Sequence, residues 1–204
     1  MSFYQHYVLP RLLHLAMRQN QFLPFRERVL GAAEGRVLEI GIGSGINLPL
    51  YRPTVRSVIG LEPSPELLRM ARTRAAVAAV PIELLEASAE QVPLDAGSVD
   101  TVVTTWTLCT IPDAHRALSE MRRVLKPGGA LLFVEHGRAP EQAVARWQDR
   151  LDPLWSRVAG GCHLNRKIDD LISESGFRID ALANARLAGP RTHTFLYEGR
   201  ARPA

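Results

Sequence analysis

The segment "VLEIGIGSGINLPLY", residues 37–51, decides the fold. An apolar run leads into glycines at the alternate positions Gly41, Gly43 and Gly45. A glycine loop of this kind after a strand usually cradles a nucleotide. In a dinucleotide-binding loop the third glycine stands three residues after the second, where this chain has Ile46. The loop alone therefore leaves open which cofactor it binds.

Short runs rich in Val, Ile and Leu alternate with helical patterns, which is typical of a parallel sheet with helices on both faces. We expect five parallel strands at residues 36–40, 57–61, 82–85, 99–104 and 130–135. Residues 177–182 and 192–199 indicate two more strands without a helix between them, so these should pair antiparallel. The prediction is an α/β fold with a doubly wound, Rossmann-like, seven-stranded sheet that binds its ligand at the carboxyl ends of the strands.

Several helix boundaries have local signals. Ser64 precedes a proline and Asp113 precedes an amphipathic segment, so both residues are predicted N-caps. The sequence "LKPGG", residues 125–129, should end the second of these helices and turn into the fifth strand. A later helix should bend or restart at Pro153, and Asn165 is the predicted N-cap of the helix after it.

The N-terminal segment, residues 1–34, is predicted to form a helical lid. Its apolar residues recur at helical spacing, at Leu9, Leu12, Leu13, Ala16 and Met17. Basic residues and histidines interrupt the segment, which makes it too polar to span a bilayer. We expect it to pack on its own domain, with peripheral contact to a membrane or a partner as the alternative. Tyr4 and Tyr7 at its start are candidates for closing over the site and contacting the substrate.

Length and composition indicate one domain. The 204 residues, 46% of them hydrophobic, can bury a full core. We divide the domain, 1–204, into the lid, a cofactor-binding core at 35–137, and substrate-side helices with closing strands at 138–204. The net charge of +4 comes from scattered arginines without a basic run, so we expect no nucleic-acid partner.

The cysteines suggest where the protein works. Cys109 and Cys162 are too few for a disulfide framework, and no segment resembles a secretory leader, so a cytoplasmic location is expected. No metal-ligand spacing surrounds either cysteine in the sequence, so the expectation is that the protein binds no metal.

Two acidic residues narrow the choice of cofactor. Glu39 ends the first predicted strand beside the glycine loop, where its charge would repel a pyrophosphate and attract an ammonium group. Glu62 ends the next strand, where a carboxylate can accept hydrogen bonds from both hydroxyls of a ribose. After the third strand, Ser88, Ala89 and Glu90 could meet an adenine ring. The pattern predicts a nucleoside ligand that carries an ammonium group and no phosphate.

A family resemblance covers residues 36–137. The chain is similar to the class I S-adenosylmethionine-dependent methyltransferases in "VLEIGIGSG", in Glu62, in "ASAEQVPL" and in "RRVLKPGGALLFVE". The resemblance implies S-adenosylmethionine as cofactor and S-adenosylhomocysteine as product. It also implies that Glu39 and the glycine loop face the methionyl part, with Glu62 at the ribose and residues 88–90 at the adenine. Asn47 and Thr105 would border the cofactor as well.

The sequence lacks the motifs of two other kinds of enzyme. Short-chain dehydrogenases use a tyrosine followed four residues later by a lysine, and none of the four tyrosines has a lysine there. Enzymes that methylate planar nitrogens often carry Asn/Asp-Pro-Pro-Tyr after the fourth strand, where this chain has "TTWTLCTIPD", residues 104–113. The absence favours a small or apolar acceptor that packs against Trp106 and Leu108.

The C-terminal part resembles a narrower group. "WTLCTIPD", "VEHGRAP" and the segment from Trp147 to Phe177 are similar to the alkyl thiol S-methyltransferases. This implies a thiol acceptor, for which His136 is the candidate catalytic base, since a base would raise the thiolate fraction. Cys109 and His163 are candidate substrate contacts.

Other functions stay open at the sequence level. Within methyl transfer, the alternatives are C- or O-methylation of a quinone or phenol and N-methylation of a phospholipid amine. From a different class, the protein could bind S-adenosylmethionine as a sensor without turnover. Neither the identity of the acceptor nor the oligomeric state can be read from the sequence.

Overall fold

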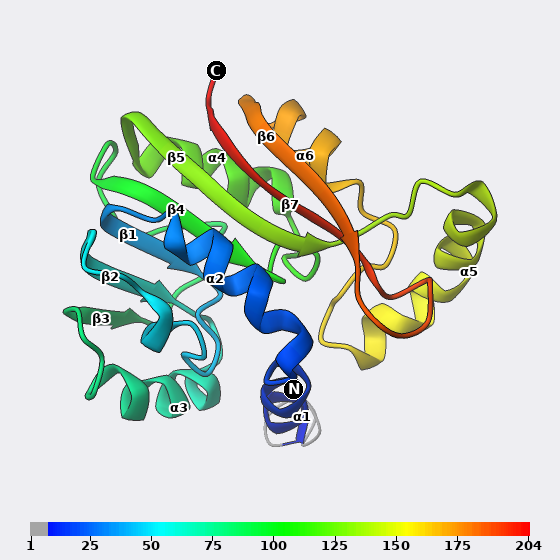
Figure 1. Cartoon of the computed structure of the whole chain (residues 1–204), viewed down its shortest axis with the longest axis horizontal. Helices are drawn as coiled ribbons and strands as arrows, with labels where there is room; N and C mark the ends of the chain where they lie inside the picture. Colours follow the sequence, from blue (N-terminus) through cyan, green and yellow to red (C-terminus); the bar gives the residue numbers. More distant parts are fainter. Residues whose placement is uncertain (1–7) are drawn as a thin grey trace.

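The computed structural model describes residues 8–204 and contains one seven-stranded sheet in the order β3-β2-β1-β4-β5-β7-β6 (Figure 1). The strands are β1 (Gly35–Ile40), β2 (Val55–Leu61), β3 (Ile82–Leu85), β4 (Val99–Thr105), β5 (Leu125–His136), β6 (Phe177–Arg186) and β7 (Phe195–Pro203). The first five strands are parallel, and β7 pairs antiparallel with both β5 and β6. The predicted α/β architecture, with its antiparallel closing pair, is confirmed.

The glycine loop lies at the switch point of the sheet. β1 has β2 on one side and β4 on the other, so the chain order reverses across β1. The loops after these strands diverge there and leave a crevice at the carboxyl edge, which is where doubly wound sheets bind ligands.

The described helices begin and end close to the predicted positions. They are α1 (Leu9–Met17), α2 (Leu23–Gly31), α3 (Pro65–Ala75), α4 (Ala114–Val124), α5 (Gln142–Val158) and α6 (Ile168–Glu174), with short 3-10 turns at η2 (Asn20–Phe22) and η3 (Leu48–Leu50). Ser64 caps α3 and Asp113 caps α4, each through a hydrogen bond accepted from a backbone N–H. Both capping predictions are confirmed.

One prediction about the C-terminal helices was wrong, and part of a second was. The N-cap residue of α6 is Lys167 and not Asn165, whose amide instead donates to the carboxylate of Asp149 at 3.0 Å. α5 runs through Pro153 as one helix, so it does not restart there. The hydrogen bond from Asn165 to Asp149 on another helix therefore takes the place of the predicted N-cap hydrogen bond.

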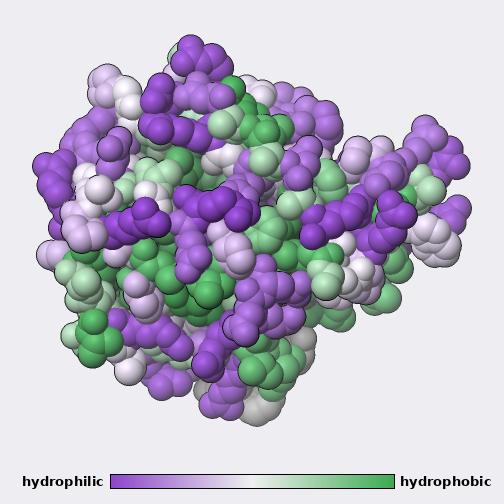
Figure 2. All heavy atoms as spheres, in the orientation of Figure 1, coloured by the Kyte–Doolittle hydropathy of each residue, from purple (hydrophilic) through white to green (hydrophobic). Residues whose placement is uncertain are grey.

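The core has two parts, one on each face of the sheet. One cluster contains Leu118 of α4 and Ile172 of α6, and the other contains Leu30 of α2 and Leu68 of α3. Within residues 8–204 no helix is both long enough and apolar enough to cross a bilayer. The predicted N-terminal helix is present as α1, and its side chains Leu12 and Leu15 are exposed. Figure 2 shows apolar surface in the region of this helix.

Candidate functional site

A cavity of about 480 Å³ lies at the carboxyl ends of β1, β2 and β4, under α1. Its lining contains most of the residues predicted to bind the cofactor: Glu39, Gly41, Gly43, Asn47, Glu62, Ser88, Ala89 and Thr105. Of the remaining predicted residues, Gly45 and Glu90 are not among those that line it. The residues after β1, β2, β3 and β4 therefore converge on one space, as the positions of their strand ends predict.

The glycine loop owes its shape to backbone angles that favour glycine. Gly41, Gly43 and Gly45 have φ values of 67°, 55° and 76°. A Cβ atom on Gly41 would lie 2.4 Å from the side chain of Thr107, so the loop after β4 can approach only a glycine here. The backbone N–H of Gly43 donates to the Glu62 carboxylate at 3.1 Å, which ties the loop to the end of β2.

Glu39 is a buried carboxylate in a network of polar side chains. It accepts hydrogen bonds from the amide of Asn47 at 2.7 Å and from the hydroxyl of Tyr51 at 2.8 Å. Burial raises the pKa of Glu39 to about 7, against the hydrogen bonds of Tyr51 and Asn47 and the positive charge of Arg26. A buried acid of this kind gains from a cation placed beside it, and the ammonium group predicted from the sequence is such a cation.

Arg26 is a site residue that the sequence did not reveal. It lies on α2, is 5% exposed, and lines the cavity. Its guanidinium donates to the side-chain oxygen of Asn47 at 2.5 Å and lies 4.8 Å from the ring centre of Trp106. Burial lowers the pKa of Arg26 to about 10, while the charge of Glu39 acts in the opposite direction. A buried guanidinium at the Glu39 end of the cavity can bind a carboxylate.

Glu62 has the geometry expected of a ribose-binding acid. One carboxylate oxygen accepts the N–H of Gly43 and the other accepts the N–H of Ser64 at 3.0 Å. Each oxygen keeps a further lone pair, and the side chain faces the cavity. Burial raises the pKa of Glu62, and the two backbone hydrogen bonds oppose that shift.

The adenine-side segment is held in place by Glu90. The Ser88 hydroxyl donates to the Glu90 carboxylate at 3.0 Å, and that carboxylate also accepts the N–H of Asp113 at 2.7 Å. Ser88 and Ala89 line the cavity. Glu90 thus fixes the loop that presents its two neighbours.

α1 forms one wall of the cavity, as the predicted lid would. Leu9, Pro10, Leu13, His14 and Met17 line the cavity from this helix. A ring nitrogen of His14 lies 2.6 Å from the hydroxyl of Ser44 in the glycine loop. Tyr4 and Tyr7, the proposed closing residues, lie outside the described residues.

Residues of the loops after β4 and α5 form the wall of the cavity on the candidate acceptor side. Trp106, Thr110, Ile111, Gly160 and Gly161 line it. Trp106 has φ 53°, a left-handed conformation that is rare for a bulky residue and often marks a functional position. Its ring lies edge-on to Phe22 at a centroid distance of 4.9 Å. Aliphatic and aromatic surface here would suit an apolar acceptor.

Four other predicted acceptor-side residues lie behind this wall. Leu108, Cys109, His136 and His163 are not among the described residues that line the cavity. Leu108 and Cys109 are buried, and the imidazole of His163 binds the carboxylate of Asp152 at 2.9 Å. The structure thus brings none of the four to the cavity surface.

His136 lies instead beside both cysteines. Its Nδ1 is 3.8 Å from the Sγ of Cys162, which is 3.7 Å from the Sγ of Cys109. Both thiols are free. The hydrogen bond from Cys109 lowers the pKa of Cys162, helped by His136, whereas the same thiol pair and burial raise the pKa of Cys109.

A second buried acid, Glu135, was also missed. It is fully buried at the end of β5 and accepts the backbone N–H of Thr107 at 3.0 Å and of Cys109 at 3.4 Å. Burial raises the pKa of Glu135 to about 7 against these hydrogen bonds. Glu135 therefore shapes the loop after β4 that carries part of the acceptor-side wall.

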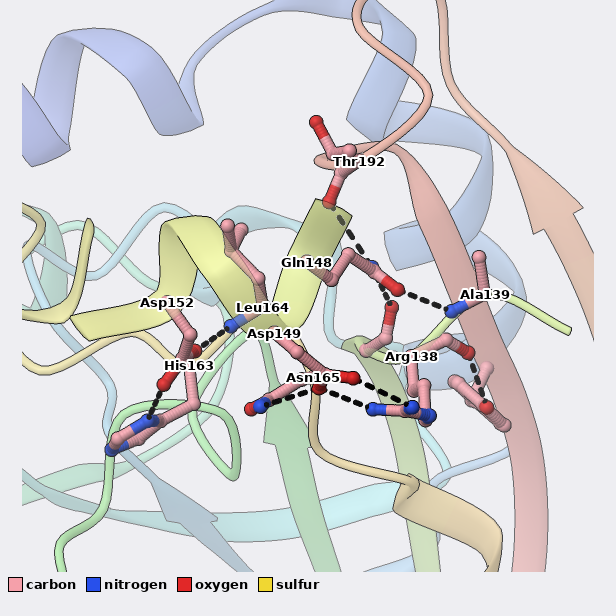
Figure 3. Close-up of polar contacts among 11 residues, drawn as sticks. Arg138, Ala139, Gln148, Asp149, Asp152, His163, Leu164, Asn165 and Thr192 are labelled. Carbon is pink, nitrogen blue, oxygen red and sulfur yellow. Dashed lines mark hydrogen bonds and ion pairs between the residues drawn. The ribbon is translucent and has the colours of Figure 1, made fainter. Parts of the chain in front are cut away.

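The loop after α5 is held by polar side chains of that helix (Figure 3). Asp152 accepts the N–H of Leu164 at 2.7 Å in addition to the His163 imidazole. Asp149 binds the guanidinium of Arg138 at 2.6 and 3.0 Å. The buried Gln148 bridges the backbone of residues 137 and 139. α5 thus fixes both the segment after β5 and the loop around Cys162.

Comparison with known families gives one match over the centre of the chain. The family described as "Methyltransferase domain" matches residues 38–133. These residues include the glycine loop, Glu62, the adenine-side segment and most of β5.

Two curated relatives have similar sequences. The thiol S-methyltransferase TMT1B of Homo sapiens is 35% identical over 144 residues, which are 68% of this chain and 59% of that protein. The phosphatidylethanolamine N-methyltransferase of Cereibacter sphaeroides is 35% identical over 131 residues, which are 60% of this chain and 64% of that protein. The chain therefore spans about three fifths of the length of these relatives.

A solved structure supports the same grouping. A crystal structure described as a SAM-dependent methyltransferase from Methanosarcina mazei matches with a TM-score of 0.66 and 26% identity. The match covers 82% of this chain and 92% of that one.

Proposed function

Because this chain belongs to the class I S-adenosylmethionine-dependent methyltransferases, we propose that it transfers the methyl group of that cofactor to a small-molecule acceptor, with a thiol as the leading candidate. The observation that carries the proposal is a cavity whose lining includes Glu39, Glu62 and apolar side chains around Trp106. The acid pair fits the cofactor, and the wall fits the acceptor.

The residues of the cavity fit S-adenosylmethionine. Glu39 would face its ammonium group and Arg26 its carboxylate, while Glu62 would accept the ribose hydroxyls. Ser88 and Ala89 would meet the adenine. Two buried acids of raised pKa beside the loop suit a cationic ligand and disfavour a pyrophosphate.

In methyl transfer, the main task of the protein is to position the cofactor and the acceptor. The sulfonium of the cofactor supplies an activated methyl group, which an attacking atom displaces in line. The chain's own contribution is to hold donor and acceptor in contact and to exclude water, and α1 and the Trp106 wall would do this on either side of the cavity.

A thiol acceptor is supported by the similarity to TMT1B, described as a thiol S-methyltransferase. A thiol of pKa about 8.5 is already a few per cent thiolate at neutral pH, so its methylation needs little or no base. We propose His136 as the base that would deprotonate any remaining thiol. Because it lies behind the cavity wall, it would act through a bridging water or after a movement of the wall. A methylation rate of His136→Ala that follows the same pH profile as the native protein would exclude this role.

The second candidate is N-methylation of a phospholipid amine, favoured by the similarity to the Cereibacter sphaeroides enzyme. Methylation of a quinone or phenol on carbon or oxygen and a sensor without turnover stay as further alternatives. We also retain the cytoplasm as the proposed location.

The deciding experiment measures release of S-adenosylhomocysteine with a panel of alkyl thiols, phenols, quinols and ethanolamine lipids. We expect turnover with thiols at a rate well above that with the other classes. Turnover of amines or quinols with inactive thiols would overturn the thiol assignment. Calorimetric binding of S-adenosylmethionine without turnover of any panel member would support the sensor, and absence of binding would refute the whole proposal.

A further inference from the structure

We propose that Cys109, His136 and Cys162 form a binding site for a thiophilic metal ion, with Zn²⁺ as the ion it suits best. One sulfur or nitrogen atom from each side chain can be chosen so that all three atoms lie within 4.8 Å of one another. The inference does not depend on which acceptor the cavity takes, because the three residues lie behind its wall. An ion bound to His136 would exclude the proposed role of that residue as a base, so the two roles are alternatives.

Two of the three distances between donor atoms match a zinc site. Zinc binds thiolate sulfur at about 2.3 Å and imidazole nitrogen at about 2.0–2.1 Å in a tetrahedron. Two sulfurs at such a centre are roughly 3.8 Å apart, and a sulfur and a nitrogen roughly 3.5 Å. The Cys109 and Cys162 sulfurs lie 3.7 Å apart, and the Cys162 sulfur lies 3.8 Å from Nδ1 of His136. Two of the three edges therefore need to change by no more than a few tenths of an ångström. The third edge, between Cys109 and His136, lies within 4.8 Å and would shorten to roughly 3.5 Å when the ion binds.

The donor atoms are of the right kind and carry the right charge. Two thiolates and a neutral imidazole balance the charge of a divalent ion, so the buried complex would be electrically neutral. Thiolate ligands also select zinc or copper(I) over magnesium and calcium, which prefer oxygen. Three protein ligands leave the fourth tetrahedral position to water.

His136 has unused bonding capacity in this place. The ring is 6% exposed, and its Nε2 has no hydrogen-bond partner among residues 8–204. Its Nδ1 faces only the long contact with the Cys162 sulfur. Buried imidazoles normally have partners for both nitrogens, and a metal bond would satisfy one of them.

The three side chains are held together by the backbone around them. The N–H of His163 donates to the carbonyl of Cys109 at 2.8 Å, which joins the loops that carry the two cysteines. Arg166 donates to the carbonyls of Leu108 at 2.5 Å and Ile111 at 2.6 Å. Together with the α5 contacts of Figure 3, these bonds fix the ends of the loops before any ion arrives.

A metal ion bound at this site would affect the cavity, because the loops that carry the two cysteines also line it. Thr110 follows Cys109 and Gly161 precedes Cys162, and both line the cavity. A metal at the three ligands would therefore tie together the two loops that form the acceptor-side wall. Each coordinating thiol would release its proton to solvent as it binds.

The test measures zinc in the full chain, purified under reducing conditions, by elemental analysis and by competition with a chromogenic chelator. We expect one zinc per chain and the release of protons when zinc is added to metal-free protein. Cobalt(II) in place of zinc should give the charge-transfer absorption of thiolate ligands, a signal that does not depend on activity.

The variants are Cys162→Ser and His136→Asn, with His115→Ala as the matched control because His115 is an exposed histidine on α4. Each ligand variant should lose more than about 100-fold in zinc affinity. Changes to residues that only hydrogen-bond to a metal ligand usually cost less than this. The control should bind as the native protein does. Cys162 is partly exposed, so Cys162→Ser keeps the test available if a buried variant fails to fold.

Three results would overturn the proposal: reduced protein that binds no zinc at micromolar concentration, zinc binding unaffected by Cys162→Ser, or a cobalt complex without thiolate absorption. A protein whose two cysteines form only a disulfide, and which binds no zinc after reduction, would show that the pair is redox-active and not a metal site.

Discussion

At the scale of single residues, the same side chain does different work at the ends of three strands. Glu39 lies at the end of β1, Glu62 just beyond β2, and Glu135 near the end of β5. Each of the three side chains is at least nine-tenths buried. Glu39 and Glu62 face the cavity, whereas Glu135 binds the backbone of the loop after β4. Position relative to the cavity, and not residue type, therefore separates the proposed ligand contacts from the structural acid.

The ribose assignment predicts a specific loss for Glu62→Ala. Removal of an acid that accepts two hydroxyl hydrogen bonds should weaken S-adenosylmethionine binding by about 30-fold or more, since hydrogen bonds to charged groups contribute about 1.5–3 kcal/mol each. Calorimetric titration measures this. Glu66→Ala changes a partly exposed acid of α3 that does not line the cavity, so this control should bind normally. An unchanged affinity for Glu62→Ala would remove the ribose assignment.

Glu39 predicts a pH dependence of cofactor binding. Its pKa of about 7 in the free protein should fall when a cationic group binds beside the carboxylate. Binding below that pH then requires loss of a proton, so the affinity for S-adenosylmethionine should drop up to about tenfold per pH unit below about pH 7. Glu39→Gln should bind more weakly and without this slope. A flat profile for the native protein between about pH 6 and about pH 8 would contradict the prediction.

At the scale of elements, α1 should control how fast the cofactor leaves. Leu13 lines the cavity, whereas Leu15 on the same helix is 67% exposed. A charge at position 13 should separate the helix from the glycine loop, because an unpaired buried charge is costly. We expect Leu13→Asp to raise the dissociation rate of S-adenosylhomocysteine by about tenfold or more, measured by stopped-flow fluorescence. Leu15→Asp is the matched control, and equal rates for the two variants would show that α1 is no lid.

Local signals explain which elements could be predicted from the sequence. Ser64 and Asp113 were identifiable as caps because each bonds to its own helix within three residues. Asn165 was not, since its partner Asp149 lies on another helix. Arg26 was missed because nothing in the pattern of α2 sets it apart from the exposed Arg28 two residues later.

The cluster of Cys109, His136 and Cys162 could not be predicted from the sequence either, because its members lie on different elements. Its members are separated by 136 − 109 = 27 and 162 − 136 = 26 positions and lie after β4, at the end of β5 and after α5. Metal sites are recognised in a sequence when ligands recur at short spacing. Here only the packing of three elements brings the ligands together, so the sequence predicted no metal.

At the scale of the whole molecule, buried acids make stability depend on pH. The pKa of Glu39 is about 7 in the folded protein and about 4.5 in the unfolded chain. Its contribution to folding stability is therefore fully present below about pH 4.5 and is lost as the pH rises through about 7, by an amount on the order of 1–3 kcal/mol.

The variant Glu39→Gln isolates this effect. Its Tm relative to that of the native protein should rise by several degrees between about pH 5 and about pH 8, because only the native protein then carries a buried charge at this position. Constant differences in packing cancel in the comparison. Glu66→Gln controls for the removal of an acid that is only partly buried. A Tm difference that stays level across this range would mean that Glu39 is ionised in the folded protein throughout.

The position of β7 between β5 and β6 has a consequence for the order of events during synthesis. β6 pairs with no strand but β7 among the described residues, although the ribosome makes β6 first. Residues 177–186 must therefore wait, with both edges unpaired, until residues 195–203 have emerged from the exit tunnel and docked on β5. The strand that is made last thus completes the sheet, because it joins β6 to the five parallel strands.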